Sequence, residues 1–191
     1  MIITILAEPR SGSTNLALWF RLQKNFTVFL EPLNPNMAAY DEYKNGVSPK
    51  LWEYETPHLL IKEICNNDRK EIPELLEMSD KIVMLYRKNK SQQIESWLNA
   101  TMSGKWYVKW KPNSLIITNK QDKVAYFNNM VESFKSDYLN NDSFFKISYE
   151  ELYHNDGFKL LLNYLNIDDL EDIAFPYGEK LRIEGTPNRL I

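Results

Sequence analysis

A short loop near the start of the chain combines a cation, small hydroxyl residues and a glycine. It reads AEPRSGSTNL over residues 7–16, between an apolar run and a stretch with helical spacing. Gly12 lets the backbone approach an anion closely, and the amino end of the following helix favours negative charge. Arg10 adds a guanidinium that can bind an oxyanion through two hydrogen bonds. The loop therefore predicts a phosphate-type site, with a solvated turn as the alternative for this segment alone.

The loop has the spacing of a Walker A motif but lacks its lysine. That motif reads G-x-x-x-x-G-K-[ST], and its lysine reaches the β- and γ-phosphates. Here Ala7 and Gly12 occupy the two glycine positions, and Ser13 stands in the lysine position. The difference disfavours a nucleotide or small-molecule kinase. Such a kinase remains an alternative, and so does a nucleotide-binding module without catalytic activity.

A second polar segment follows another predicted strand. KIVMLYR, residues 81–87, has the pattern of a buried strand, and SQQIESWLNA then predicts a helix with Ser91 as its N-cap. Arg87, Lys88 and Ser96 place two cations and a hydroxyl there, although a charged helix cap is the alternative. In a parallel sheet both polar segments lie beyond the carboxyl ends of their strands. We therefore expect the two segments at the same edge of the sheet.

The remaining segments predict how these loops are held. Strands are expected over residues 1–6, 26–30, 58–64, 81–87 and 143–148, and helices from Thr14, from Ser91 and over 123–138. Strands that alternate with helices indicate an α/β fold. We expect a single three-layer domain over residues 1–191, with a mainly parallel central sheet and a P-loop-like phosphate-binding loop.

Composition excludes several classes of protein. The formal net charge of −3 argues against a general electrostatic grip on nucleic acid. Cys65 is the one cysteine, and with only His58 and His154 beside it the chain offers no spaced set of zinc ligands. No apolar stretch approaches the roughly 20 residues of a membrane span. We expect a cytoplasmic protein without a metal, a nucleic-acid partner or a membrane span, and leave the oligomeric state open.

The two polar segments resemble those of the sulfotransferases that use 3′-phosphoadenosine 5′-phosphosulfate (PAPS). PRSGST, residues 9–14, looks like their 5′-phosphosulfate loop in the arginine form of tyrosylprotein and some bacterial carbohydrate sulfotransferases. The family also holds the 3′-phosphate with an arginine that ends a strand and a serine eight residues later. LYRKNKSQQIESW is similar to that segment, but Ser96 lies nine residues after Arg87 and eight after Lys88. Either cation is a candidate, and Arg87 is favoured because it ends the strand and can bind bidentately.

The resemblance extends over most of the chain. FLEPLNP, residues 29–35, looks like an element after the second strand of carbohydrate sulfotransferases, and residues 147–167 resemble the family's late strand and helix pair. Tyr149 there is similar to a family tyrosine near the adenine, with a core aromatic as the alternative. Many cytosolic members place a tryptophan directly after the loop, where this chain has Asn15; Trp19, one turn later, is expected in the core.

The resemblance implies transfer of a sulfuryl group from PAPS, as co-substrate, to a hydroxyl of a glycan, glycolipid or other small acceptor, without a metal. Such a reaction needs a base for the hydroxyl and cations for the developing charge. Glu31 is the candidate base and Arg10 the candidate stabilising cation. The expected donor site comprises Arg10, Ser11, Gly12, Ser13, Thr14, Asn15, Arg87, Lys88, Ser96 and Tyr149.

Glu31 is placed near the donor because it ends the second predicted strand, which is expected beside the first. The alternative is an exposed turn acid before Pro32. Glu8 is a competing carboxylate but is expected to be an exposed loop residue, and Glu63 with Lys62 could orient the acceptor or the donor. For the acceptor, flat aromatic faces are available on Trp106, Tyr107 and Trp110.

Overall fold

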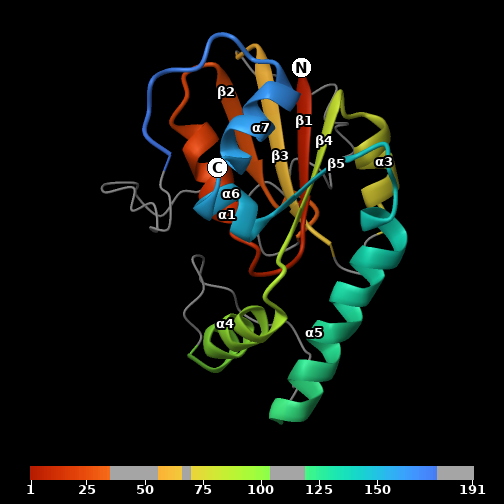
Figure 1. Cartoon of the computed structure of the whole chain (residues 1–191). Helices are drawn as coiled ribbons and strands as arrows, with labels where there is room; N and C mark the ends of the chain where they lie inside the picture. Colours follow the sequence, from red (N-terminus) through yellow and green to blue (C-terminus); the bar gives the residue numbers. More distant parts are fainter. Residues whose placement is uncertain (35–55, 66–69, 104–118, 176–191) are drawn as a thin grey trace.

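A computed structural model describes residues 1–34, 56–65, 70–103 and 119–175 (Figure 1). Five strands form one sheet: β1 (Ile2–Ala7), β2 (Phe26–Leu30), β3 (His58–Ile64), β4 (Lys81–Tyr86) and β5 (Phe145–Ser148). The strand order is β2-β3-β1-β4-β5, and all four pairings are parallel. The predicted α/β class and its parallel sheet are confirmed. The bounds predicted for β2 and β3 match the structure, and those of the other three strands differ by one or two residues at an end.

Helices follow most of the strands. They are α1 (Ser13–Arg21), α3 (Ile72–Glu77), α4 (Lys90–Ser103), α5 (Lys120–Phe134), a π-helical turn (Lys135–Leu139), α6 (Tyr149–His154) and α7 (Gly157–Leu165). The prediction that Ser91 caps α4 is wrong, because Ser91 lies inside the helix. Asn89 takes the cap position, and its Oδ1 accepts a hydrogen bond from the backbone N–H of Gln92 at 3.1 Å.

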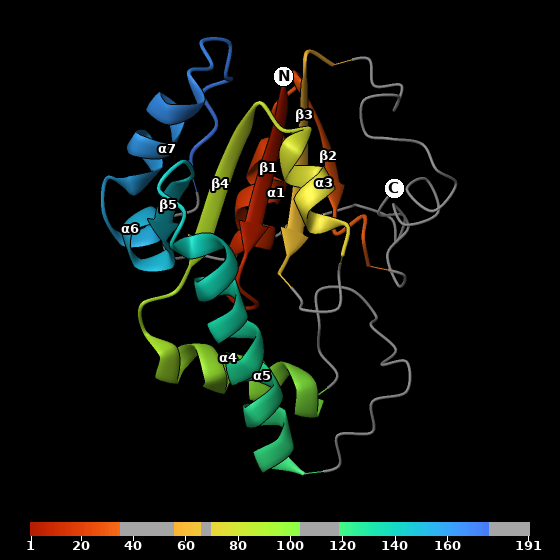
Figure 2. The ribbon, with the colours of Figure 1, turned by 90° about the vertical axis from the view of Figure 1, so that its right-hand side faces the viewer.

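The helices cover both faces of the sheet and so make three layers. One face of β1, with Ile3 and Ile5, belongs to a buried cluster that includes side chains of α1, α6 and α7. The other face, with Ile2 and Leu6, packs with side chains of α3 and the end of α5. Figure 2 shows α3 in front of the sheet and α1 behind it. Trp19 is buried in the first of these clusters, as predicted.

The strand order corrects one expectation about the position of Glu31. β3 lies between β1 and β2, so the strand that precedes Glu31 is not a neighbour of β1. Consecutive strands are often adjacent, but here the third strand takes the inner position. Leu59, Leu60 and Ile61 are fully buried in succession, as an inner strand covered on both faces requires.

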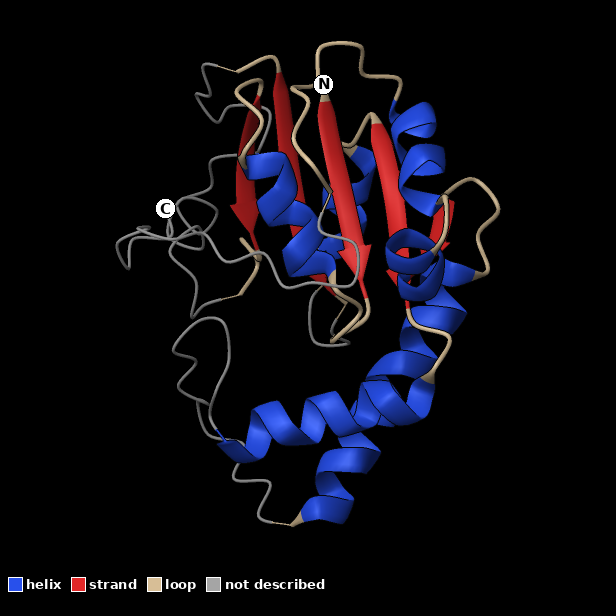
Figure 3. Ribbon diagram, turned by 60° about the vertical axis from the view of Figure 1, so that its left-hand side comes forward, coloured by secondary structure: helices blue, strands red, loops and turns tan. Residues whose placement is uncertain are grey.

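All five strands point toward the same edge of the sheet, where α4 and part of α5 lie (Figures 1 and 3). Ligands of open parallel sheets bind outside this carboxyl edge. The segments that follow β1, β2, β3 and β4 therefore begin at one end of the molecule. Within the described residues, no helix has both the length and the apolar character needed to cross a bilayer.

Candidate functional site

The loop after β1 requires glycine at position 12. Gly12 has a φ of 83° and directly precedes α1, so this helix has no side-chain cap. A Cβ at this position would lie 2.8 Å from ring atoms of both Tyr149 and Tyr153. The hydroxyl of Tyr153 also donates a hydrogen bond to the carbonyl oxygen of Gly12 at 2.8 Å. Two rings of α6 therefore close one side of the loop and leave room for hydrogen only.

The polar residues of this loop have different roles. The Ser11 side chain is buried, and its hydroxyl donates to the carbonyl oxygen of Glu8 at 2.8 Å, so it maintains the loop. Ser13 and Thr14 begin α1, and the backbone N–H groups of a first helical turn have no partner within the helix. The N–H of Asn15 donates to the carbonyl oxygen of Gly12 at 3.0 Å. The amino end of α1 is thus the part of the loop suited to bind an anion.

Arg10 connects this loop with the segment after β4. Its Nε donates to the hydroxyl of Ser96 in α4 at 3.0 Å. Nη1 of Arg87 donates in turn to the carbonyl oxygen of Arg10 at 3.3 Å. Residues separated by 86 and 77 positions in the chain are therefore in direct contact. The two polar segments expected at one edge of the sheet form one continuous site.

Arg87 is held between the loop and α6. Its guanidinium lies 4.5 Å from the ring centroid of Tyr149, and its Nη2 donates to Gln92 at 3.1 Å. Its Nε is buried and finds no hydrogen-bond partner among the described residues, and the nearest oxygen of Glu150 is 3.9 Å away. A buried donor without a partner is costly, and an anionic ligand would satisfy it. The structure thus gives Tyr149 a contact with Arg87, while its contact with an adenine stays a prediction.

Lys88 turns away from the loop toward α6. Its Nζ donates to Glu151 at 2.7 Å, and its side chain is 52% exposed. This hydrogen bond raises the pKa of Lys88. The backbone N–H groups of Lys88 and Asn89 donate to the carboxylate of Glu150 at 3.0 and 2.9 Å. Of the two candidate cations, the geometry therefore favours Arg87 as the ligand of an anion at the loop.

Glu31 is paired with a buried lysine. It directly follows β2, is 22% exposed, and accepts a hydrogen bond from Nζ of Lys62, which is 1% exposed. Nδ2 of Asn34 donates to its second oxygen at 2.9 Å. Lys62 lies in β3, where it is the register partner of Ile5 in β1. Its contact with Glu31 therefore links the end of β2 to the strand that lies between β2 and β1. A single lysine within the apolar run of β3 was the sequence signal for this contact.

Arg10 and Glu31 share an unusual backbone conformation. Their φ angles are 63° and 52°, and in the described part of the chain Asn166 is the third non-glycine residue with a positive φ. Asn166 ends α7, where the left-handed conformation is common. Elsewhere such a conformation costs about 1 to 3 kcal/mol and is concentrated at functional sites. Arg10 and Glu31, the residues predicted to be catalytic, are thus the two non-glycine residues of the described ranges that have a positive φ away from a helix end.

Two neighbouring carboxylates are fully buried. The expectation that Glu8 is an exposed loop residue is wrong, because its backbone N–H still pairs with the carbonyl oxygen of Leu85 in β4 at 3.0 Å. The chain therefore leaves the sheet one residue later than the sequence pattern indicates. Glu63 accepts hydrogen bonds from the N–H groups of Leu33 and Ile64 at 2.9 and 2.8 Å and so fixes the segment after β2.

Two further expectations concern the acceptor surface and a metal site. Trp106, Tyr107 and Trp110, the predicted acceptor surface, lie outside the described residues. Within the described ranges, no three His, Cys, Asp or Glu side chains are grouped so that they could hold a metal ion.

Comparison with known proteins identifies the fold. No protein-family model and no curated protein sequence matches the chain. Among solved structures, mouse sulfotransferase SULT7A1 complexed with PAP is 18% identical, with a TM-score of 0.56 over 89% of this chain. The match covers 59% of that structure, so this chain spans about three-fifths of its length. Deoxyadenosine kinase from M. mycoides with bound dATP is 14% identical, and the match covers 87% of this chain and 100% of the kinase. Its TM-score is 0.44, too low to support a conclusion.

The likeness to the mouse protein shows the fold alone, because the identity is low. The chain has a P-loop-like α/β fold of the kind found in that sulfotransferase. What such a fold does depends on the side chains at its site.

Proposed function

We propose that this protein is a sulfotransferase that moves a sulfuryl group from PAPS to a hydroxyl of a glycan, glycolipid or other small acceptor. The observation that carries the proposal is the contact between the loop after β1 and the segment after β4 through Arg10, Ser96 and Arg87. One segment resembles a 5′-phosphosulfate loop and the other a 3′-phosphate site. A nucleotide with anionic groups at both positions would satisfy both.

The residues present fit such a nucleotide. The Gly12 position admits no side chain, the amino end of α1 is uncapped by a side chain, and Arg87 keeps an unsatisfied buried Nε. When bound, PAPS supplies an activated sulfuryl group with a phosphate as its leaving group. The N–H groups of Ser13 and Thr14 with Arg10 would bind the phosphosulfate end, and Arg87 with Ser96 the 3′-phosphate. Arg10 also offers positive charge where it develops during transfer.

Glu31 is the proposed general base for the acceptor hydroxyl. A positioned carboxylate can accept the proton as the hydroxyl attacks, which removes charge that would otherwise build up on the acceptor. Lys62 and Asn34 each hold one carboxylate oxygen of Glu31, so both are positioning residues. The left-handed backbone of Glu31 lies directly after the end of β2.

Isothermal titration calorimetry on the purified protein tests the assignment. We expect 3′-phosphoadenosine 5′-phosphate (PAP) to bind without magnesium and more tightly than ATP, because ATP lacks the 3′-phosphate. Arg10→Ala should weaken PAP binding and also lower the rate of sulfuryl transfer from radiolabelled PAPS to an accepting hydroxyl.

Two results would contradict the proposal in different ways. Magnesium-dependent binding and turnover of ATP with no preference for PAP would indicate a nucleotide or small-molecule kinase. PAP binding without transfer to any member of a panel of glycan, glycolipid and phenolic hydroxyls would indicate a nucleotide-binding module without catalytic activity.

A further inference from the structure

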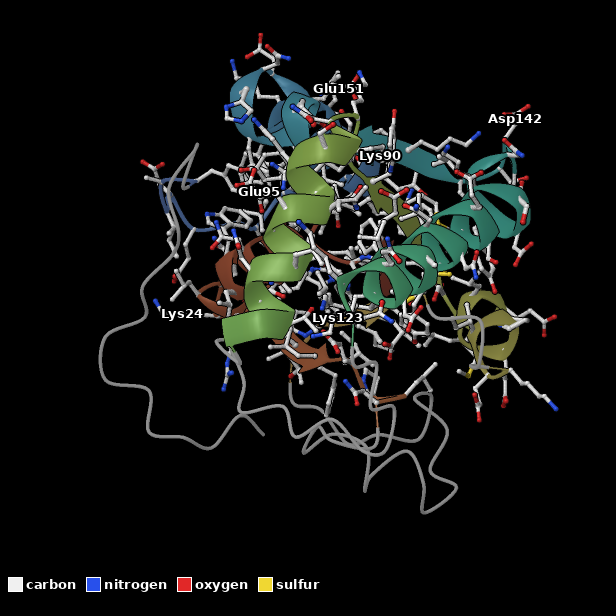
Figure 4. All side chains as sticks on the ribbon, turned by 90° about the horizontal axis from the view of Figure 1, so that it is seen from below. Lys24, Lys90, Glu95, Lys123, Asp142 and Glu151 are labelled. Carbon is white, nitrogen blue, oxygen red and sulfur yellow. The ribbon has the colours of Figure 1, made fainter. Side chains whose placement is uncertain are left out.

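An ion pair whose carboxylate is fully buried joins the two proposed phosphate-binding segments, and the proposed reaction leaves its role unassigned. Glu8 directly follows β1, and Lys90 is the first residue of α4. Nζ of Lys90 donates to both carboxylate oxygens of Glu8, at 2.8 and 2.6 Å. Gln93, which is also fully buried, donates to Oε2 of Glu8 at 3.0 Å and to the carbonyl oxygen of Pro9 at 2.8 Å. Figure 4 shows Lys90 and Glu151 at the same end of α4.

The same carboxylate also holds the backbone at the end of β4. The N–H of Arg87 donates to Oε2 of Glu8 at 3.0 Å. Glu8 therefore binds the residue proposed to contact the 3′-phosphate, and Lys90 begins the helix that carries Ser96. Through Gln93 the same cluster binds Pro9, which precedes Arg10. The buried Glu8 side chain thus contacts the strand end and the helix start, and Gln93 connects it to the loop.

We propose that Glu8, with Lys90 and Gln93, sets the spacing between the phosphosulfate loop and the 3′-phosphate segment and so couples binding of the two ends of one nucleotide. The inference rests on the proposed function. Glu8 is a positioning residue in it. With no exposed surface and four hydrogen bonds from N–H groups, it is poorly placed to take a proton from an acceptor.

The cluster of Glu8, Lys90 and Gln93 is better explained by a geometric role than by a gain in stability. An ion pair with a buried carboxylate often adds little net stability compared with apolar side chains of the same size, because the buried charge loses its water. A rigid separation has a different benefit. A ligand that bridges two sites gains from the second contact only if the sites are already at the separation that the ligand requires. The distance between the 5′ and 3′ substituents of a nucleotide varies little, so the two segments must match it.

The ratio of two affinities tests this coupling. Calorimetry with PAP and with adenosine 5′-phosphate gives the factor by which the 3′-phosphate tightens binding. In Glu8→Gln we expect this factor to fall about 10-fold, while the affinity for adenosine 5′-phosphate changes by less than about 3-fold. A merely structural role would lower the folded fraction and weaken both ligands equally, which leaves the ratio unchanged.

Variants are chosen so that the protein still folds. Lys90→Met would leave a buried carboxylate without its cation, which is strongly destabilising. In Glu8→Gln the freed ammonium of Lys90 can reach water, because this side chain is 34% exposed. The double variant Glu8→Gln/Lys90→Met removes both charges, and we expect it to lower the ratio no further than Glu8→Gln does. Gln93→Ala keeps both charges and should lower the ratio about 3-fold.

Glu63→Gln is the matched control, because Glu63 is an equally buried carboxylate whose N–H partners Leu33 and Ile64 lie outside both phosphate segments. This control should keep the wild-type ratio. The proposal is overturned if Glu8→Gln, the double variant or Gln93→Ala is folded by thermal unfolding and keeps that ratio. A wild-type protein that binds both nucleotides equally would instead contradict the proposed function itself, before any substitution is made.

Discussion

Glu31 combines two features that a solvated turn carboxylate does not need. Its backbone is left-handed, and its side chain holds the buried ammonium of Lys62. Removing a cation from water is costly unless it is paired, so this contact explains how β3 tolerates a lysine within an apolar run. The same contact limits where the carboxylate of Glu31 can point. The Glu31 side chain is only 22% exposed, so the alternative interpretation as an exposed turn acid fits the structure less well.

Glu31→Gln is the sharpest test of its proposed catalytic role. The amide has nearly the same shape but cannot accept the proton, so we expect turnover to fall about 10²- to 10⁴-fold with little change in donor affinity. Steady-state rates and PAP calorimetry measure the two effects separately. Glu132→Gln in α5, where the side chain is 71% exposed, is the control and should behave as wild type. Full turnover of Glu31→Gln at every pH would assign the base to another residue.

Arg87 and Lys88 are adjacent in sequence but differ in their surroundings. Arg87→Ala and Ser96→Ala should each weaken PAP more than adenosine 5′-phosphate, by about 1 to 3 kcal/mol for a lost charged hydrogen bond. Lys88→Ala should have a smaller selective effect, because its ammonium is bonded to Glu151. Calorimetry with both nucleotides on all three variants provides the comparison. A larger selective loss for Lys88→Ala would move the 3′-phosphate ligand by one residue.

At the scale of elements, α6 supports both phosphate segments from one side. Its first turn is capped reciprocally by Ser148 and Glu151. Tyr149 and Tyr153 contact the loop at Gly12, and Glu150 binds the backbone after β4. Burial alone would raise the pKa of Glu150, but hydrogen bonds from Lys88 and Asn89 hold it below its ordinary value. Through these contacts the short helix α6 links the last described part of the chain to both polar segments.

The capping carboxylate makes the stability of this region depend on pH. Hydrogen bonds from Lys88 and Ser148 lower the pKa of Glu151 from 4.5 to about 2. A carboxylate with a lower pKa in the folded state contributes stability above its unfolded pKa, and this is lost as pH falls through its folded pKa. Glu151→Gln can still cap α6 but cannot titrate, so its stability deficit should shrink as pH falls from about 5 to about 2.

Urea unfolding of wild type and Glu151→Gln across this pH range measures the difference. Glu151 is 41% exposed and its partner Lys88 52%, so water screens the pair and we expect a deficit below about 1 kcal/mol at neutral pH. A deficit that stays constant from neutral to acid pH would show that Glu151 does not titrate in this way.

For the whole molecule, a nucleotide that bridges two segments separated by 77 to 86 positions in the chain should stabilise the complete fold. PAP at 100 times its dissociation constant should add about 2.7 kcal/mol and raise the melting temperature by about 5 to 10 °C. Gly12→Ala should lose this shift at the same PAP concentration, because its Cβ would overlap the rings of Tyr149 and Tyr153. Thermal unfolding with and without PAP measures the shift, and an equal shift in both proteins would contradict the loop assignment.

Local patterns predicted the five strands, the helices α1, α4 and α5, and both polar segments, because strand and helix periodicity and the residues of a turn are properties of neighbouring positions. The position of Arg87 at the end of β4 and of Ser13 at the start of α1 could be predicted in this way to within a residue. The cap of α4 was predicted wrongly at Ser91, because Asn89, two residues earlier, is also a good N-cap. Such errors are small and stay within one turn.

Long-range contacts could not be predicted from the same patterns. Sequence patterns were sufficient to predict an α/β fold with two polar segments at the carboxyl edge of its sheet. The folded chain was needed to show that β3 separates β1 from β2, that Lys62 reaches Glu31, and that Glu8 is buried against Lys90. The two side-chain contacts join residues 31 and 82 positions apart, and the strand order and burial determine which residues meet. Local periodicity fixes which way a side chain faces on its own element, but its partner depends on which elements the core brings together.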